Sequence, residues 1–387
     1  MTDWASRVVA TVKTVVGGGK TGLHEPTISE HDRAIVNECL RSGYVSSVGE
    51  LVTRFEGALV EYTGARFAIA MSSGTNALQV AAQAAGVQPG DEVLLPSLSF
   101  VATANAMVHA GAIPHFVDIS RETLGLDPVS LDEYLEEIAE PGESGPIHKT
   151  TRRRISAVVP MHCFGHPVDM KSLLTVSAKW GIPVVEDAAE ALGSFRGPDH
   201  MGTLGLVGVF SFNGNKIVTT GGGGAVVTND EKLATYARHL SATAKVPHEW
   251  EFDHDEVGFN YRMPNLNAAL RWSQLQELES SVMRKRLLAK RYQEAFSDFD
   301  NLEMFSEPKG ARSNYWLNTI IQSNQSVGIR DQILRIAHDA GIFLRPAWRL
   351  LHQLKPYKNN ARSPLKISEN LQPRIVNLPS SSFLSVK

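Results

Sequence analysis

The sequence has few cysteines and little net charge, and both features argue against particular classes of protein. It contains only Cys39 and Cys163 among 387 residues, with no CxxC pair, so we predict neither a zinc site nor a disulfide framework. The formal net charge is -3, which gives no basic field for nucleic acid or an anionic membrane. We interpret the one tight basic run, residues 152–154, as a solvated loop. These absences favour a cytoplasmic protein with no metal, nucleic-acid or membrane partner.

Long hydrophobic runs are also missing. Residues 8–16 are apolar, but Lys13 interrupts them and glycines 17–19 follow, so the stretch lacks the length of a spanning helix. We interpret it as a short amphipathic segment with a flexible exit. The alternative is a weak secretory signal, which the scarcity of cysteine disfavours.

What is present is an alternation of short apolar runs with helical patterns, in a chain that is 43% hydrophobic and 20% charged. This rhythm predicts βαβ units and a mostly parallel sheet. The expected strands are 67–71, 92–96, 113–117, 155–160, 183–186, 207–212 and 224–228, and the expected helices are 76–85, 101–110 and 170–180.

The last third of the chain has a different pattern. Residues 265–296 are rich in Leu, Ala, Gln, Glu and Arg, which favours one or two long helices leading to a second unit. Beyond them we expect a strand at 318–322, a helix at 330–340 and a strand at 342–344. The predicted division is an N-terminal segment at 1–30, a large α/β domain at 31–265, connecting helices at 266–300 and a small α+β domain at 301–387.

The first candidate site is the turn Ser-Ser-Gly-Thr-Asn at residues 72–76, between an expected strand and an expected helix. Free backbone amides and hydroxyls at a helix N-terminus bind anions, most often phosphate. The alternative is an ordinary helix cap. The turn matches neither G-x-G-x-x-G nor the Walker loop, which disfavours nicotinamide and ATP chemistry.

The second candidate is Asp187, at the end of the run Val-Val-Glu-Asp-Ala-Ala-Glu. A carboxylate at the C-terminal end of a parallel strand points into the ligand crevice of an open α/β sheet. There it can keep the nitrogen of a pyridine-ring cofactor protonated. The alternative is a helix cap.

The third candidate is Lys216, in Phe-Ser-Phe-Asn-Gly-Asn-Lys at 210–216, followed by four glycines at 221–224. A lysine amine forms an imine with an aldehyde cofactor only when it is deprotonated, and partial burial promotes that state. A lone lysine is usually a surface charge, but here it accompanies an anion turn and a placed carboxylate.

Together with Pro-Ser-Leu-Ser-Phe-Val-Ala-Thr at 96–103, these segments resemble the DegT/DnrJ/EryC1/StrS family of sugar aminotransferases. The resemblance runs from about Pro26 into the C-terminal region. It implies the aspartate-aminotransferase fold (fold type I) with pyridoxal 5'-phosphate as cofactor. The loop Asn-Gly-Asn-Lys with Thr-Thr-Gly-Gly-Gly-Gly, and residues 345–352, resemble the branch that acts on UDP-linked 4-keto-6-deoxy-N-acetyl sugars, of the bacillosamine or legionaminic acid type.

The resemblance also implies roles in cofactor binding. Lys216 is expected to form the Schiff base and to carry the proton between the substrate carbon and the cofactor, while Asp187 pairs with the ring nitrogen. The other expected cofactor contacts are the amides of Gly74 and Thr75 with the Ser211 hydroxyl at the phosphate, Phe100 on the ring face, and Glu190 near the phenolic oxygen. Many relatives have Gln in place of Glu190, and the alternative for Phe100 is a core aromatic.

Other expected roles concern the substrate and a second subunit. Asn260, in Gly-Phe-Asn-Tyr-Arg, matches a segment that crosses to the partner in this family, which implies a homodimer with shared active sites. His162 lines the pocket or is a structural histidine. Tyr315, Arg345 and Trp348 are candidates for binding the nucleotide.

The predicted reaction moves an amino group from L-glutamate to the C4 keto group of a nucleotide-linked, UDP-type, 4-keto-6-deoxy-N-acetylhexosamine. The alternatives are a 3-aminotransferase acting on a dTDP-keto sugar, a non-catalytic regulator that binds the cofactor, and a generic α/β binding protein. A related sugar 3-dehydratase is disfavoured, because that branch carries histidine where this chain keeps Lys216.

Overall fold

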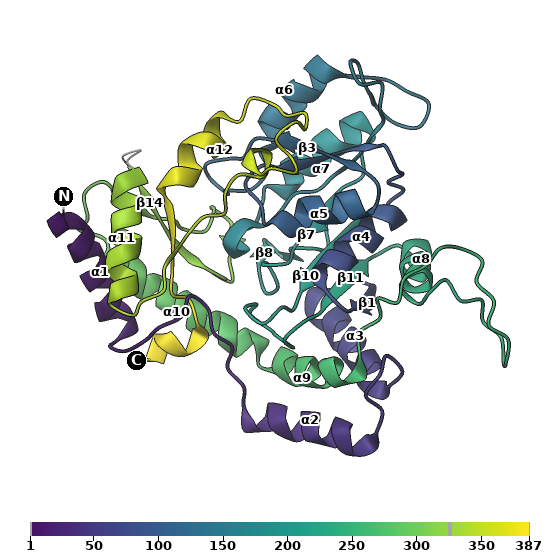
Figure 1. Ribbon diagram of the computed structural model, residues 1–387, viewed down its shortest axis with the longest axis horizontal. Coiled ribbons are helices and arrows are strands. Elements are labelled where there is room, and N and C mark those ends of the chain that lie inside the picture. The colour runs from purple at the N-terminus through teal and green to yellow at the C-terminus, as the bar shows by residue number, and fades with distance from the viewer. Residues whose placement is uncertain (1, 324–326, 387) are drawn as a thin grey trace.

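The computed structural model describes residues 2–323 and 327–386, and shows a large layered domain beside a smaller sheet and its helices (Figure 1). Residues 1 and 387, the ends of the predicted domain division, and 324–326 lie outside the described part. Among the helices of the described ranges, none is long and apolar enough to cross a membrane.

The large domain is built on seven strands. They are β1 (Phe67–Met71), β2 (Glu92–Pro96), β3 (Ile113–Val117), β6 (Ile155–Val158), β7 (Val185–Asp187), β10 (Val207–Ser211) and β11 (Gly224–Thr228). Two sheets, β1-β11-β10-β7 and β3-β2-β6, are joined by the parallel bridges Val158 to Val184 and Met161 to Asp187. Strand β11 runs antiparallel to both of its neighbours, and the other pairings are parallel. The predicted α/β class with a mostly parallel sheet is confirmed.

Helices cover both faces of this sheet. The helices of this domain are α2 (Glu30–Ser42), α3 (Glu50–Thr63), α4 (Gly74–Ala84), α5 (Val101–His109), α6 (Pro128–Ile138), α7 (Met170–Trp180), α8 (Glu231–Ser241) and α9 (Asn265–Gln276). Side chains of α4, α5 and α8 form one apolar core with the sheet, while α3, α6, α7 and α9 form the other. Because both faces are covered, the strands read as nearly continuous apolar runs in the sequence.

The smaller unit is an antiparallel sheet in the order β12-β14-β16-β15. Its strands are β12 (Leu302–Met304), β14 (Asn318–Gln322), β15 (Arg345–Pro346) and β16 (Ile375–Leu378); its helices are α1 (Thr2–Val16), α10 (Leu278–Ala295), α11 (Val327–Asp339) and α12 (Lys366–Leu371). Helices α1, α10 and α11 share one apolar core with the sheet, and Figure 1 shows them gathered at one side of the molecule. The N-terminal segment is therefore a packed helix of this unit, where the sequence predicted a short amphipathic segment.

Several short elements complete the chain. They are β4 (Ala139–Glu140), β5 (Ile147–His148), β8 (Phe195–Arg196), β9 (Asp199–His200), β13 (Ala311–Arg312) and the 3-10 turns η1 (Cys163–Gly165), η2 (Leu351–Gln353), η3 (Gln372–Arg374) and η4 (Ser382–Val386).

The predicted strand at 342–344 is wrong. Ile342 makes only an isolated parallel bridge with Thr21, and the strand in this region is β15, two residues long and paired with β16. Ile342 and Leu344 are apolar because they belong to the core around α1 and α11, not because they pair in a sheet. Side-chain burial and strand pairing leave the same short apolar pattern, so the sequence did not separate them.

Candidate active site

A cavity of about 300 Å³ opens at the C-terminal ends of the parallel strands. This is the crevice where ligands bind in open α/β sheets. It brings together most of the predicted cofactor residues. Its lining is Ser73, Gly74, Thr75, Leu78, Phe100, Ala102, Met161, Asp187, Ala189, Glu190, Ser211, Asn213, Asn215, Lys216, Gly222, Gly223, Trp316 and Trp348.

One end of this cavity is the turn that opens α4. The Ser73 side chain accepts a hydrogen bond from the Asn76 amide at 3.1 Å, which caps the helix and turns its first amides toward the cavity. Gly74 cannot carry a side chain, because a Cβ atom there would lie 2.9 Å from the Cβ of Ser211. The turn is therefore the helix cap of the alternative interpretation, and the same residues line the cavity, so the anion site stays a prediction.

The glycine run 221–224 borders this end. A Cβ on Gly224 would lie 2.4 Å from the Ser73 carbonyl oxygen, so the glycine permits β11 to pass directly against the turn. Gly224 pairs with Met71 on one side and with Ser211 on the other. The antiparallel strand thus joins the turn before α4 to the end of β10.

Asp187 ends β7 at the opposite side of the cavity. It is 3% exposed, and its carboxylate accepts hydrogen bonds from the Thr103 hydroxyl at 2.7 Å and the Ala189 amide at 3.1 Å. Burial raises the pKa of the Asp187 carboxyl, and the two hydrogen bonds act against that rise. A cationic partner in the cavity would stabilise the carboxylate.

His162 does not line this cavity. It is fully buried, its Nε2 lies 3.0 Å from the Glu186 carboxylate, and its Nδ1 accepts the Val168 amide. Glu186 also accepts amide hydrogen bonds from Gly202, Leu204 and Gly205. These contacts are those of a structural histidine, which is the alternative given for His162. The pair of His162 and Glu186 fixes the loop at residues 202–205 against β7.

Lys216 enters the cavity from the loop after β10. Its Nζ lies 3.0 Å from a Glu190 carboxylate oxygen and 3.8 Å from the centroid of the Trp316 ring. Trp316 is held in place by its indole N–H, which donates to the Asn215 carbonyl oxygen at 2.8 Å. The lysine is 9% exposed, so it is the buried, oriented amine that the loop pattern predicted.

Glu190 is buried beside this amine. Burial raises the pKa of its carboxyl to about 7, although Lys216 and the Phe164 amide both stabilise the charged form. A carboxyl with a pKa near neutrality can exchange a proton with a neighbouring amine at working pH.

Two aromatic residues form the outer wall. Phe100 caps the start of α5 and is 47% exposed, so it is not the core aromatic of the alternative interpretation. Its ring centroid lies 6.0 Å from that of Trp348, which in turn lies 5.0 Å from Phe164. Phe100 and Trp348 give the cavity an apolar, aromatic side.

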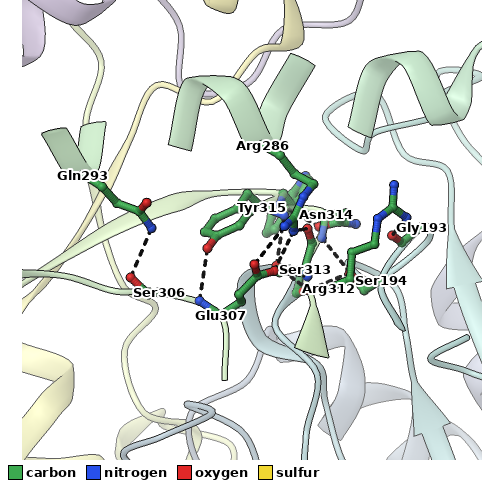
Figure 2. Close-up of polar contacts among 12 residues, drawn as sticks. Gly193, Ser194, Arg286, Gln293, Ser306, Glu307, Arg312, Ser313, Asn314 and Tyr315 are labelled. Atoms are coloured by element: carbon green, nitrogen blue, oxygen red, sulfur yellow. Dashed lines mark hydrogen bonds and ion pairs between the residues drawn. The ribbon is translucent and has the colours of Figure 1, made fainter. Parts of the chain in front are cut away.

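Tyr315 is not part of the site. It is 4% exposed and absent from the cavity lining, and its hydroxyl accepts the Glu307 amide at 3.1 Å beside Arg286 (Figure 2). Its φ of 46° places it in the left-handed region, and the next residue, Trp316, supplies the cavity wall instead. Of these two adjacent aromatic residues, the cavity is therefore lined by Trp316 and not by the predicted Tyr315.

Arg345 and Asn260 also lie outside the lining of this cavity. Arg345 is exposed in β15, and one of its N–H groups donates to the carbonyl of Leu344. Asn260 is exposed and its backbone bridges to Ala242. Thr103 and Trp316 contact the site and were missed; Thr103 closes the 96–103 motif, whereas no sequence signal marked Trp316.

A second cluster of ligand-type side chains lies at the other end of β2. Glu92, His115 and His148 are buried within reach of one another. His115 uses both ring nitrogens, on Glu92 at 2.8 Å and on the Tyr134 hydroxyl at 2.9 Å. The Nδ1 of His148 accepts the amides of Thr150 and Thr151. These contacts describe a hydrogen-bonded network in which both ring nitrogens of His115 and the Nδ1 of His148 have partners.

Known structures share this architecture over nearly the whole chain. The aminotransferase TlmJ from Streptoalloteichus hindustanus superimposes with a TM-score of 0.83 at 30% sequence identity, covering 94% of each chain. With the amine, the carboxylate and the anion turn in one cavity, the fold and site define a fold type I aminotransferase that uses pyridoxal phosphate.

The sequence comparisons identify the family. Its profile, that of the DegT/DnrJ/EryC1/StrS aminotransferase family, matches residues 26–387, and the chain belongs to this family. The chain is 34% identical to EpsN of Bacillus subtilis (strain 168), which is named as a pyridoxal phosphate-dependent aminotransferase, over 95% of this chain and 92% of EpsN. It is also 34% identical to the GDP-perosamine synthase of Caulobacter vibrioides (strain ATCC 19089 / CIP 103742 / CB 15), over 93% of each protein.

Proposed function

We propose that this chain transfers the amino group of L-glutamate to the C4 keto group of a nucleotide-linked 4-keto-6-deoxy sugar. The observation that carries the proposal is the position of Lys216 and Asp187 on one cavity whose far end is a helix N-terminal anion turn. An amine, a ring-nitrogen carboxylate and a phosphate cradle are what pyridoxal-phosphate chemistry requires.

The residues of the cavity fit this cofactor. Ser211 and the amides at Gly74 and Thr75 would hold the phosphate, and the missing Cβ of Gly74 lets this turn pack directly against Ser211. Asp187 and Phe100 line the same cavity, where the carboxylate would pair with the ring nitrogen and the aromatic side chain would offer a face for the ring.

When bound, the cofactor supplies an electron sink for the carbanion formed at the substrate carbon. The protein supplies the proton transfers and the orientation. Lys216 Nζ holds the cofactor and then moves the proton on and off the reacting carbon. The Asp187 carboxylate keeps a proton on the ring nitrogen, and its buried position with Thr103 fixes its direction.

Glu190 controls the charge beside Lys216. In the free protein its carboxylate forms an ion pair with the lysine amine. Because the pKa of Glu190 is raised to about 7, the carboxyl is able to take a proton when the amine gives up its charge. We assign it to the neighbourhood of the phenolic oxygen of the cofactor.

The aromatic wall supports a sugar substrate. Trp348 and Phe100 present ring faces and edges at the cavity mouth, and sugar rings pack well on aromatic rings through their C–H faces. For the nucleotide we propose UDP with an N-acetylated sugar, because residues 210–224 and 345–352 resemble that branch. The similarity to a GDP-perosamine synthase makes a GDP-linked sugar the competing candidate.

A homodimer completes the proposal. The segment between α8 and α9 extends away from the body of the single chain (Figure 1) and carries Trp250, Phe252 and Val257 at 71%, 78% and 85% exposure. Large apolar side chains at such exposure mark an interaction surface. The segment leads to Asn260, which we assign to the phosphate of the partner subunit.

The experiment is a substrate panel. Purified enzyme with pyridoxal phosphate and glutamate is offered UDP-, GDP- and dTDP-linked 4-keto-6-deoxy sugars, and the products are identified by mass spectrometry and NMR. We expect amination at C4 of the UDP-linked N-acetyl sugar. Amination of the GDP sugar alone would move the assignment to that branch, amination at C3 would support the 3-aminotransferase, and no transfer to any acceptor would reject the proposed function.

A double variant tests the proposed dimer. Trp250→Ser with Phe252→Ser is expected to shift the protein toward monomer in sedimentation velocity and to weaken cofactor binding. A double variant that remains fully dimeric would remove this segment from the interface.

A further inference from the structure

Arg271 is a fully buried arginine on α9 whose charge has no acidic partner among the described residues. Its exposure is 0%, and its guanidinium donates to the Thr220 hydroxyl at 2.9 Å, the Gly224 carbonyl at 3.3 Å and the Met263 sulfur at 3.2 Å. Its Nε has no hydrogen-bond partner. A buried cation without a paired anion is costly, so its presence requires an explanation.

The surroundings of Arg271 offset only part of the free-energy cost of burying its charge. The guanidinium lies 3.6 Å from the centroid of the Phe212 ring and 4.7 Å from that of Phe55, which are favourable cation–π distances. Burial nevertheless lowers the pKa of the guanidinium, which reflects the cost of holding the charge there, although an arginine stays protonated at neutral pH.

The position of this charge is informative. A Cβ on Gly223 would lie 2.0 Å from Arg271 Nη2, so the guanidinium sits directly behind the glycine run, and Gly222 and Gly223 face the cavity on the other side. Gly224, whose carbonyl it binds, passes against the Ser73–Gly74 turn. One layer of backbone separates the cation from the anion end of the cavity.

We propose that Arg271 is a positioning residue for the cofactor phosphate: its buried charge is compensated by the phosphate dianion across the glycine run. The proposal rests on the assignment of the phosphate to the turn at residues 73–75. A charge behind a wall of glycine backbone acts at short range through a medium of low polarity, where Coulomb attraction is stronger than in water. Arg271 also orders the wall itself, together with Asn267, whose amide donates to the carbonyls of Thr220 and Gly222.

Two substitutions separate charge from shape. Arg271→Gln keeps hydrogen-bond donors but removes the charge, and Arg271→Lys keeps the charge but loses the planar fork. The ligands are pyridoxine 5'-phosphate and pyridoxine, which lack the aldehyde and so cannot react with Lys216. Their dissociation constants are measured on the apoprotein by calorimetry or fluorescence, together with the thermal midpoint of unfolding.

We expect Arg271→Gln to weaken pyridoxine 5'-phosphate by about tenfold or more while pyridoxine binding changes little, and Arg271→Lys to retain most of the phosphate affinity. The matched control is Arg374→Gln, which removes another buried arginine from the small domain and is expected to leave both affinities unchanged.

The outcomes are distinct. Equal weakening of both ligands in Arg271→Gln, or full phosphate affinity in that variant, would overturn the role of the charge. If Arg271→Gln binds pyridoxine 5'-phosphate and Arg271→Lys does not, then hydrogen bonds rather than the charge order the glycine run, and the proposal is also wrong. Wild-type protein that binds neither ligand would instead reject the assignment of the cofactor site.

Discussion

The two ends of the cavity are built in opposite ways. At one end, Lys216, Glu190 and Asp187 are charged side chains, each held by a partner within 3.0 Å. At the other, the turn at residues 73–75 and the glycine run 221–224 offer backbone, with the charge of Arg271 hidden behind them. Charged side chains can move protons, whereas a backbone cradle can only hold a ligand. The first end should therefore govern turnover and the second should govern affinity.

The largest effect is expected at the amine. Lys216→Ala should lower amino transfer from glutamate by roughly 10⁴-fold, because it removes the amine that we assign to moving the proton on the reacting carbon. The affinity for pyridoxine 5'-phosphate should remain close to that of wild type. The comparison would fail if turnover and affinity fell together, and the exposed Lys232→Ala serves as the control in which neither changes.

Asp187→Asn should lower the rate of transfer by about 10²–10³-fold, because a neutral amide would not hold a proton on the nitrogen of the cofactor ring. The protein should still fold, since the amide can keep the Thr103 hydrogen bond. Single-turnover kinetics with glutamate measure the rate, with the exposed Asp199→Asn as control. A wild-type rate in Asp187→Asn would show that the carboxylate does not serve the ring.

A change in the turn at residues 73–75 or the glycine run beside it should alter the affinity for pyridoxine 5'-phosphate. Gly224→Ala places a Cβ atom 2.4 Å from the Ser73 carbonyl oxygen, and displacing that turn should cost about 1–3 kcal/mol of stability or ligand binding. Titration with pyridoxine 5'-phosphate measures the loss of ligand binding, and urea unfolding measures the loss of stability. Gly214→Ala, whose Cβ would meet only the Gly221 carbonyl at 3.8 Å, is the matched control. Unchanged affinity and stability in Gly224→Ala would show that the turn and β11 separate easily.

The last expected effect, similar in size to that of Gly224→Ala, is a pH dependence at Glu190. The folded-state pKa of Glu190, about 7, lies above the value in an unfolded chain, so its protonated carboxyl stabilises the folded protein at low pH. This contribution is lost as the pH rises from the unfolded-chain pKa to the folded-state pKa. Relative to Glu190→Gln, the free energy of unfolding of the apoprotein should fall by about 1–3 kcal/mol between about pH 5 and pH 8. A difference that stays constant, as expected for the exposed Glu249→Gln, would contradict a raised pKa.

Much of this architecture was predictable because the information is local. The expected strands at 67–71, 92–96, 113–117, 224–228 and 318–322 have the observed bounds, since buried strands between helices leave apolar runs of defined length. Lys216, Asp187 and the turn at 72–76 stand in short motifs at strand ends, where parallel topology brings them to one crevice.

What escaped the sequence depends on contacts between distant segments. Tyr315 and Trp316 are adjacent aromatics, and the left-handed backbone at Tyr315 decides which of them faces Lys216. Arg271 lies in a helix rich in polar residues, where an arginine ordinarily faces solvent. Only the packing of α9 against Phe212 and the glycine run shows that it is buried.

The lysine itself can be identified chemically. Wild-type protein loaded with pyridoxal phosphate is reduced with borohydride, which fixes the cofactor to the amine that holds it, and the digest is mapped by mass spectrometry. We predict a single modified peptide containing Lys216, and none from protein treated with glutamate before reduction. Modification of a different lysine, or an equal yield after glutamate, would contradict the assignment of Lys216 as the amine that binds the cofactor and releases it during transfer.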